Sequence, residues 1–329
     1  MAAQDAPQLS PALPDVVSLL MDGNGGSQSV ELTTAPVQTG FHWVHLRRDA
    51  PAAEMFLASA GLDPHIVDAL TADDTRPRCT VHGDGVLLNL RGVNLIEGAA
   101  PEDMVSIRLW IEAHRVVGVW RRPLVSVVDL LAAIERGHAP QTPGDLVARL
   151  ALRLVDRAEP AVSDLSGMLD DIEEAMLDHA PSLPRRKLAE MRRQAMILRR
   201  YMLPQRDALT TLEIEDLDWL SDHDRSRLRE AAERVFRLGE ELDAIRDRAQ
   251  LVHDQLMDQR AELMNQRMLV LSVVAAIFLP LGLVAGLLGM NVGGLPGTQS
   301  PWAFWSVCAG LTGLGVVLWL WFRRNGMMR

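Results

Sequence analysis

The sequence is poor in the residues that mark several common classes of protein. It has two cysteines, Cys79 in a polar region and Cys308 inside an apolar run, and it has no Cys-x-x-Cys pair. A disulfide framework is therefore excluded, and this low cysteine usage is typical of a cytosolic soluble domain. Acidic residues number 43 against 33 basic ones, for a formal net charge of −10. This balance argues against nucleic acid as a partner, because phosphate binding needs clustered Lys and Arg.

Signals for secretion and for catalysis are missing as well. The first residues carry Asp5 instead of a basic segment, and the apolar patch Val16–Met21 is too short for the core of a signal peptide. We therefore expect residues 1–28 to form a loose tail and the large N-terminal part to stay in the cytoplasm. There is no phosphate-binding glycine loop and no other catalytic motif, so the sequence predicts neither an enzyme nor a resident cofactor.

Charged side chains are absent from one long stretch near the end, Met268–Phe322. It contains two apolar runs, Met268–Leu288 and Phe304–Phe322, joined by an uncharged turn. Each run is long enough to cross a bilayer core of ~30 Å as a helix that rises ~1.5 Å per residue. The sequence therefore predicts a hairpin of two membrane-spanning helices, with lipid as a partner.

Short strands and helices precede the apolar stretch. Alternating polarity and turn signals predict strands at Phe41–Leu46, Arg78–His82, Val86–Leu95, Val105–Ile111 and Val116–Trp120. Two segments that open on proline, Pro51–Ala60 and Pro64–Ala72, predict short helices. These elements indicate a small α/β domain, whose strand order the pattern does not define.

The region after residue 125 has the composition and spacing of helices. Helices are predicted at Val125–Arg136, Asp145–His179 and Pro184–Leu212, with Pro160 as a kink or as the true start of the second. Ser221 and Asp224 then resemble a capping box. A single helix from Ser221 to Gly289 would be about 100 Å long, so it would run from the cytoplasm into the bilayer.

The predicted fold class is an α+β membrane protein, with a cytoplasmic α/β domain and a long stalk helix that continues into the first of two transmembrane helices. The expected parts are a tail (1–28), the α/β domain (29–142), a helical part (143–220), the stalk with the first span (221–290), an outer loop (291–301) and the second span with a basic end (302–329).

The long helix carries two stripes at alternating spacings of three and four. One predicts a seam that packs against other helices; it contains Val235, Leu238, Leu242, Ile245, Ala249, Val252, Leu256 and Leu263. The other lies on nearly the opposite face and changes from acidic to amide to apolar to glycine; it contains Asp254, Asp258, Ala261, Asn265, Met268, Ser272, Ala275, Leu279, Gly282 and Gly286, with Leu271 beside it.

Two interpretations of the second stripe are open on the pattern alone. Repeated around a symmetry axis, it would line a pore, with carboxylate rings that attract cations and apolar collars that gate by dewetting. Alternatively, Asp254 and Asp258 form a solvated face and the apolar part faces lipid. A pore requires an oligomer, because one hairpin cannot enclose it. Arg260 and Arg267 precede the first span and Arg323 follows the second, so the positive-inside rule places both termini in the cytoplasm.

The triplet Gly289-Met290-Asn291, between a stalk-plus-span helix and one final span, resembles the CorA family of divalent-cation transporters. The segment Asn265–Asn291 is also similar to the pore helix of that family. The resemblance implies a homopentameric funnel in the inner membrane, with Gly289, Met290 and Asn291 at the outer pore mouth. It further implies pore-lining roles at Asn265, Met268, Leu271 and Leu279 and an inner acidic ring at Asp254; the stripe itself adds Ser272, Ala275, Gly282 and Asp258.

The outer turn Val292–Gly297 has no carboxylate, where magnesium-transporting members carry Met-Pro-Glu. This absence, together with Thr75-Arg76-Pro77-Arg78, resembles the zinc-transporting ZntB branch and implies transported Zn²⁺. A magnesium or cobalt channel of the same family is the alternative within the class, and a membrane-anchored coiled-coil scaffold is the alternative outside it.

Tightly held metal is not expected anywhere in the chain. Zinc sites need Cys, His or carboxylate ligands at tetrahedral spacing, and the spans offer none on the stripe. His42 and His45 would point to opposite faces of a strand. His253 beside Asp254 is the best remaining candidate among the histidines.

Overall fold

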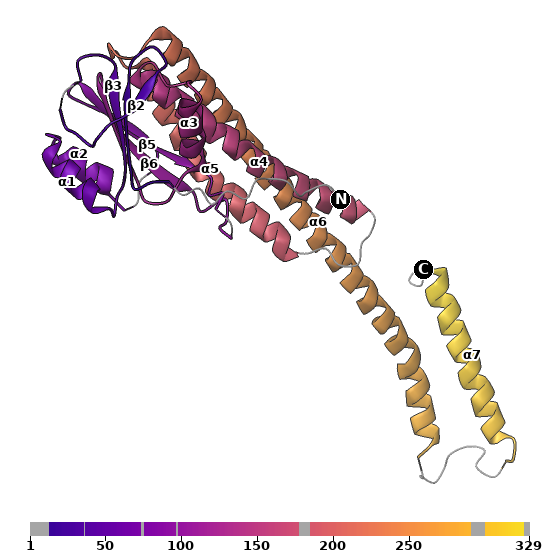
Figure 1. Ribbon diagram of the computed structural model, residues 1–329. Coiled ribbons are helices and arrows are strands. Elements are labelled where there is room, and N and C mark those ends of the chain that lie inside the picture. The colour runs from indigo at the N-terminus through magenta and orange to yellow at the C-terminus, as the bar shows by residue number, and fades with distance from the viewer. Residues whose placement is uncertain are drawn as a thin grey trace. The chain divides into compact units, whose positions relative to one another are not determined.

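The computed structural model describes residues 13–35, 37–73, 76–96, 98–177, 185–290 and 300–325 (Figure 1). They form two compact units, Met1–Leu251 and Val252–Arg329. The first unit holds the predicted α/β domain and the helices that follow it. The second holds the end of the long helix and one further helix.

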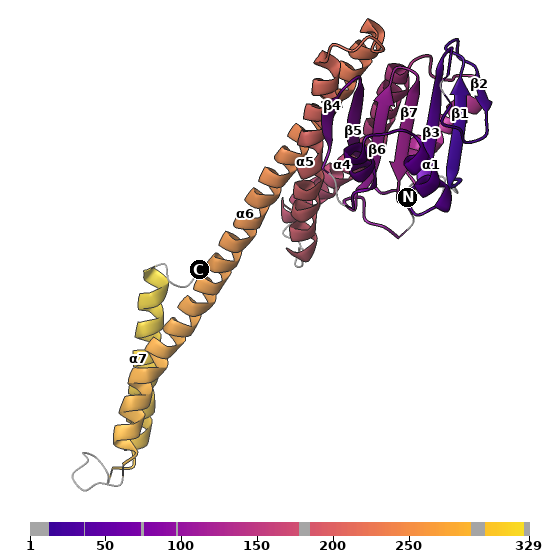
Figure 2. The ribbon, with the colours of Figure 1, turned by 90° about the vertical axis from the view of Figure 1, so that its left-hand side faces the viewer.

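A seven-stranded sheet organises the first unit (Figure 2). Its strands are β1 (Val16–Met21), β2 (Ser27–Ser29), β3 (Phe41–Arg47), β4 (Arg78–His82), β5 (Gly85–Gly92), β6 (Val105–Glu112) and β7 (Arg115–Trp120), in the order β2-β1-β3-β7-β6-β5-β4. Strands β3 and β7 pair in parallel, and the other neighbours in the described sheet are antiparallel. The strands predicted at Arg78–His82 and Val86–Leu95 pair as one antiparallel hairpin, and those predicted at Val105–Ile111 and Val116–Trp120 pair as another.

The prediction of a loose tail over residues 1–28 is wrong for its second half. Val16–Met21 forms strand β1, which pairs along its whole length with β3. Val17 and Met21 are buried there. The apolar patch is too short for a signal peptide, but it has the length of a strand, and the open edge of β3 supplies its hydrogen bonds.

Two helices lie against one face of the sheet. These are α1 (Pro51–Ser59) and α2 (Pro64–Thr71), as predicted. Asp63 caps α2, because its side chain accepts a hydrogen bond of 2.8 Å from the backbone nitrogen of His65. Phe56 and Leu70 join Val44 and Trp110 of the sheet in a buried apolar cluster.

The remaining helices are α3 (Val125–Glu135), α4 (Pro143–Leu177), α5 (Arg185–Ile214), α6 (Asp222–Leu288) and α7 (Ala303–Arg324). Helix α4 begins two residues before the predicted Asp145 and continues past Pro160, which is therefore not its start. A proline removes one backbone donor, and the other bonds of a long helix are enough to hold it. The predicted ends at His179 and Pro184 lie outside the described residues.

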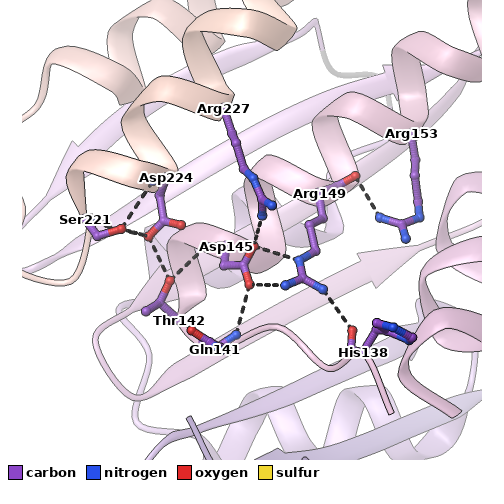
Figure 3. Close-up of polar contacts among 9 residues, drawn as sticks. All are labelled: His138, Gln141, Thr142, Asp145, Arg149, Arg153, Ser221, Asp224 and Arg227. Carbon is purple, nitrogen blue, oxygen red and sulfur yellow. Dashed lines mark hydrogen bonds and ion pairs between the residues drawn. The ribbon is translucent and has the colours of Figure 1, made fainter. Parts of the chain in front are cut away.

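The start of α6 is fixed by the predicted capping box (Figure 3). The backbone nitrogen of Asp224 donates to Ser221 Oγ (3.2 Å), and that of Ser221 donates to Asp224 Oδ2 (3.3 Å). Thr142 Oγ1 donates to the same carboxylate oxygen (2.8 Å). Buried Asp145 accepts from Arg149 of α4 and Arg227 of α6. These bonds join the first turns of α4 and α6.

The predicted seam of α6 is buried from Val235 to Leu256, with each member at most 6% exposed. Its last predicted member, Leu263, is 53% exposed, so the seam as predicted is too long for the single chain. Ion pairs accompany the buried part. Arg234 contacts Asp156 and Glu159, and Arg248, two heptads later, contacts Asp170 and Glu173.

Candidate ion-conduction path

The predicted pore-lining stripe lies on the open side of α6. All its members from Asp254 to Gly286 are exposed in the single chain. The exposed fraction is 58% for Met268, 70% for Leu271 and 79% for Leu279. Such exposure of large apolar side chains in succession needs lipid or another protein surface to cover it.

The opposite side of α6 has a short covered patch. Val273 is only 4% exposed, and Ile277, Pro280 and Leu281 are partly buried at helical spacing from it. A Cβ placed on Gly315 of α7 would lie 3.6 Å from Cδ1 of Leu281, so this side of α6 approaches α7. The stripe therefore lies away from this contact, as do most of the other exposed side chains of α6 beyond residue 256.

The polar groups of the stripe suit weak contact with a cation. Ser272 Oγ donates to the carbonyl oxygen of Met268 (2.8 Å), so the hydroxyl oxygen is left as an acceptor. Asp258 and Asn265 offer carboxylate and amide oxygens. Among the described residues, no three His, Cys, Asp or Glu side chains are grouped as metal ligands. These oxygens can contact a hydrated cation through its water shell, but among the described residues they form no cage for a bare one.

Two glycines leave bare backbone on the stripe. A Cβ built on Gly282 or Gly286 would meet no atom within 4 Å in the single chain. Glycines four residues apart allow close approach of a second helix in a membrane. The geometry is thus open to packing of this segment against another copy.

The predicted outer pore mouth is described only in part. The backbone nitrogen of Gly289 donates to Ala285 O (2.9 Å) and that of Met290 to Leu287 O (3.5 Å), where α6 ends. Asn291 and the uncharged turn after it lie outside the described residues. Thr75 of the second sequence resemblance lies outside them too.

The histidines singled out in the sequence are not joined in one site. His42 shares a 2.9 Å hydrogen bond with Ser18. His45 is buried beside Trp43 and Trp120, and its burial lowers its pKa to about 3. His253 is exposed. The two cysteines are free, as predicted.

Two described helices are long and apolar enough to cross a membrane, Asp222–Leu288 and Ala303–Arg324. The most apolar 18 residues of each helix have a mean hydropathy of 2.6 and 1.8, and at most 6% of either segment is buried. The core helix of a soluble protein of this composition would be covered. The exposure therefore favours spans, in agreement with the predicted hairpin.

Comparisons with known proteins agree with this arrangement of parts. The family model of the "CorA-like Mg2+ transporter protein" matches residues 38–324. The chain is 37% identical to the "Divalent cation transporter CmaX" of Pseudomonas aeruginosa, over 94% of this chain and 95% of that protein. It is 35% identical to the "Zinc transport protein ZntB" of Pectobacterium carotovorum, over 93% of each.

A solved structure of full-length CmaX has the same fold. It superposes with a TM-score of 0.82 at 36% identity, and the match covers 94% of this chain and 96% of that one. The α/β domain, the long helix and the second span therefore follow the order found in that structure. The chain belongs to the CorA-like family and is a divalent-cation transporter.

Proposed function

We propose that the protein takes up zinc through a pore at the centre of a homopentamer, lined by the second stripe of α6. In this proposal it lies in the inner membrane with both termini in the cytoplasm. The observation that carries the proposal is the exposed, graded stripe of α6, which lies away from the contact with α7. A membrane-anchored scaffold would need no such gradation from carboxylate through amide to glycine.

The choice of zinc is supported by two observations. The turn Val292–Gly297 has no carboxylate to form a charged ring at the outer mouth. Relatives with more than 30% identity along nearly the whole chain are named zinc transport proteins. Magnesium or cobalt is the second candidate, since the family model is described by Mg²⁺ and CmaX is named only for divalent cations.

Transport would proceed with the ion largely hydrated. Asn291 would meet the water shell of the ion at the outer mouth, and Asn265 would meet it again inside. Met268 and Leu279 would form apolar collars that close the path by dewetting. A dication that enters down an inside-negative potential of ~100 mV is stabilised by about 4–5 kcal/mol, at ~2.3 kcal/mol per charge, so inward flow needs no ATP.

Any coupling to protons has to use groups outside the spans. No carboxylate or histidine occurs from residue 268 to residue 322. The candidates are Asp254, Asp258, His253 or a group in the soluble domain. Under an imposed pH gradient, unchanged zinc uptake by an Asp254→Asn/Asp258→Asn variant would count against the two carboxylates.

The proposal is tested by uptake of Zn²⁺ and Mg²⁺ into vesicles that contain the purified protein. Replacement Asn291→Ala should abolish most of the flux, whereas Asn325→Ala, a matched change just after α7, should leave it intact. Full flux in the Asn291 variant would overturn the pore-mouth assignment. Absence of flux of either ion in the unaltered protein would favour the scaffold, and faster Mg²⁺ than Zn²⁺ entry would favour the magnesium alternative.

A further inference from the structure

Arginines gather at one edge of the sheet, away from the conduction path. Because β3 and β7 run parallel, their carboxyl ends meet, and ligands of sheets with parallel strands often bind outside such ends. Asp49 follows β3, Arg121 and Arg122 follow β7, and Arg91 lies near the end of β5. Together with Asp73 and Arg108 of β6, these residues line a cavity of about 470 Å³.

Arg108 is the unusual member of this lining. It is 1% exposed, and its Nη2 donates to the backbone oxygens of Ala72 (2.7 Å) and Asp73 (3.3 Å). Its Nε and Nη1 have no partner among the described residues. Among the residues that the structure describes, the cation therefore has backbone carbonyls for hydrogen-bond partners and no carboxylate. Burial of a charge in this way is costly unless a counterion completes it.

The nearby carboxylate is engaged elsewhere. Asp73 pairs with Arg48 (2.5 Å) and with Arg121 (3.5 Å). Directly opposite Arg108 on β5 stands Asn89, 1% exposed, whose side-chain oxygen and nitrogen also lack described partners. Buried polar atoms without partners are rare in folded proteins, so the unsatisfied Nε and Nη1 donors of Arg108, which lines the cavity, are evidence for a missing acceptor.

The local charge is opposite in sign to that of the whole chain. Four arginines and two aspartates line the cavity, although the protein carries a net charge of −10. Burial, followed by the neighbouring charges of Arg48 and Arg91, lowers the pKa of Arg108. A concave site with one excess sign concentrates ions of the other sign.

We propose that this cavity binds a phosphate-type oxyanion carried by a small soluble molecule of the cytosol. The planar guanidinium fork matches a phosphate with two parallel hydrogen bonds. The cavity volume falls in the range of small-molecule sites. Arg91, another residue of the lining, is held in place by Tyr201 of α5: the guanidinium carbon of Arg91 lies 4.3 Å from the centre of the Tyr201 ring. The sequence gives one indication of the site: Arg108 is a charged residue at the centre of the otherwise largely apolar strand VSIRLWIE.

The test uses the full-length protein in nanodiscs of zwitterionic lipid. Inorganic phosphate and adenosine monophosphate are titrated by calorimetry at constant ionic strength, with chloride as the reference anion. Saturable binding is expected, and Arg121→Gln/Arg122→Gln should weaken it at least tenfold. The matched control Arg136→Gln, an exposed arginine outside the cavity lining, should bind as the unaltered protein does.

The test replaces Arg121 and Arg122 because both are exposed. Replacement of Arg108 is not used, since loss of this buried side chain could weaken binding by disturbing the fold. Binding by the double variant equal to that of the unaltered protein, or a chloride response equal to that of phosphate, overturns the proposal. A second titration in nanodiscs with phosphatidylglycerol separates the sources. If the affinity for phosphate is the same in both kinds of nanodisc, the ligand is a soluble molecule. If phosphatidylglycerol weakens phosphate binding, the site takes a lipid headgroup and the proposal of a soluble ligand is overturned.

Discussion

The apolar seam of helix α6 is buried in the first part of the helix and exposed in the second. Before residue 257 its apolar seam is buried, with Leu242 at 0% and Ile245 at 1% exposed. Farther along the same seam, Leu263 is 53% exposed. The residue type and the spacing are the same, so the difference lies in what surrounds the helix. The first part is stabilised by the chain's own helices, and the second needs lipid or further copies.

The largest effect should come from a leucine of the buried seam. Leu242→Ala removes a fully buried side chain and should lower the free energy of unfolding of the first unit by about 2–5 kcal/mol. Leu263→Ala, the same change on the exposed part of the seam, should alter it by less than about 0.5 kcal/mol. Chemical denaturation of the detergent-solubilised protein, followed by tryptophan fluorescence, measures both.

The same pair of variants also probes the oligomer. If copies of the chain cover Leu263, the Leu263 variant should weaken association, as measured by the mass of the particle in detergent, while unfolding stays unchanged. If the two variants lowered the free energy of unfolding by the same amount, the contrast between the two parts of α6 would be wrong.

The second-largest effect should come from acidification, which should destabilise the first unit and leave the spans unaffected. The pKa of His45 is lowered by burial from 6.5 to about 3, so the folded protein excludes a proton that the unfolded chain binds. Stability is thus greatest above pH 6.5 and is lost as pH falls toward 3. Between pH 7 and pH 5 this single group should cost about 2 kcal/mol. Thermal unfolding across this range should show a slope that His45→Gln removes.

The control is His65→Gln, because His65 is exposed at the start of α2. It should leave the slope in place. The spans have no histidine or carboxylate between residues 268 and 322, so helix content in the membrane should not respond to the same acidification. A slope unaffected by the loss of His45 would mean that other groups dominate the acid response.

Patterns with a local physical cause were predicted well from the sequence. The strands on either side of Gly83-Asp84-Gly85 and the capping box of Ser221 and Asp224 depend on neighbouring residues, and both predictions are confirmed. The two spans were predicted because charge is absent over a length that matches the bilayer. The chemistry of the stripe could be listed from its spacing, but its role depends on copies of the chain that one sequence does not display.

Features that depend on distant partners were missed. Val16–Met21 is a strand because β3 presents an open edge, and nothing within the patch itself shows that edge. The arginine cavity brings together Arg91, Arg108 and Arg121 from three strands or strand ends, and the order of the strands could not be derived. The extent of the seam was overestimated at Leu263 because periodicity alone does not say where the covering helices end.

The smallest effect concerns the ion pairs that accompany the buried part of α6. Hydrogen bonds from Arg248 to Glu173 and Asp170 raise the pKa of the arginine, but all three side chains are more than a third exposed. Solvent screening therefore limits Arg248→Gln to a loss of about 0.5–1 kcal/mol. Arg237→Gln, at an exposed arginine of the same helix, is the matched control and should change less. High salt should remove the difference between the two variants, because it screens exposed charges. A difference that persists in high salt would indicate that the stem of Arg248 stabilises the first unit by packing, as the leucines of the seam do.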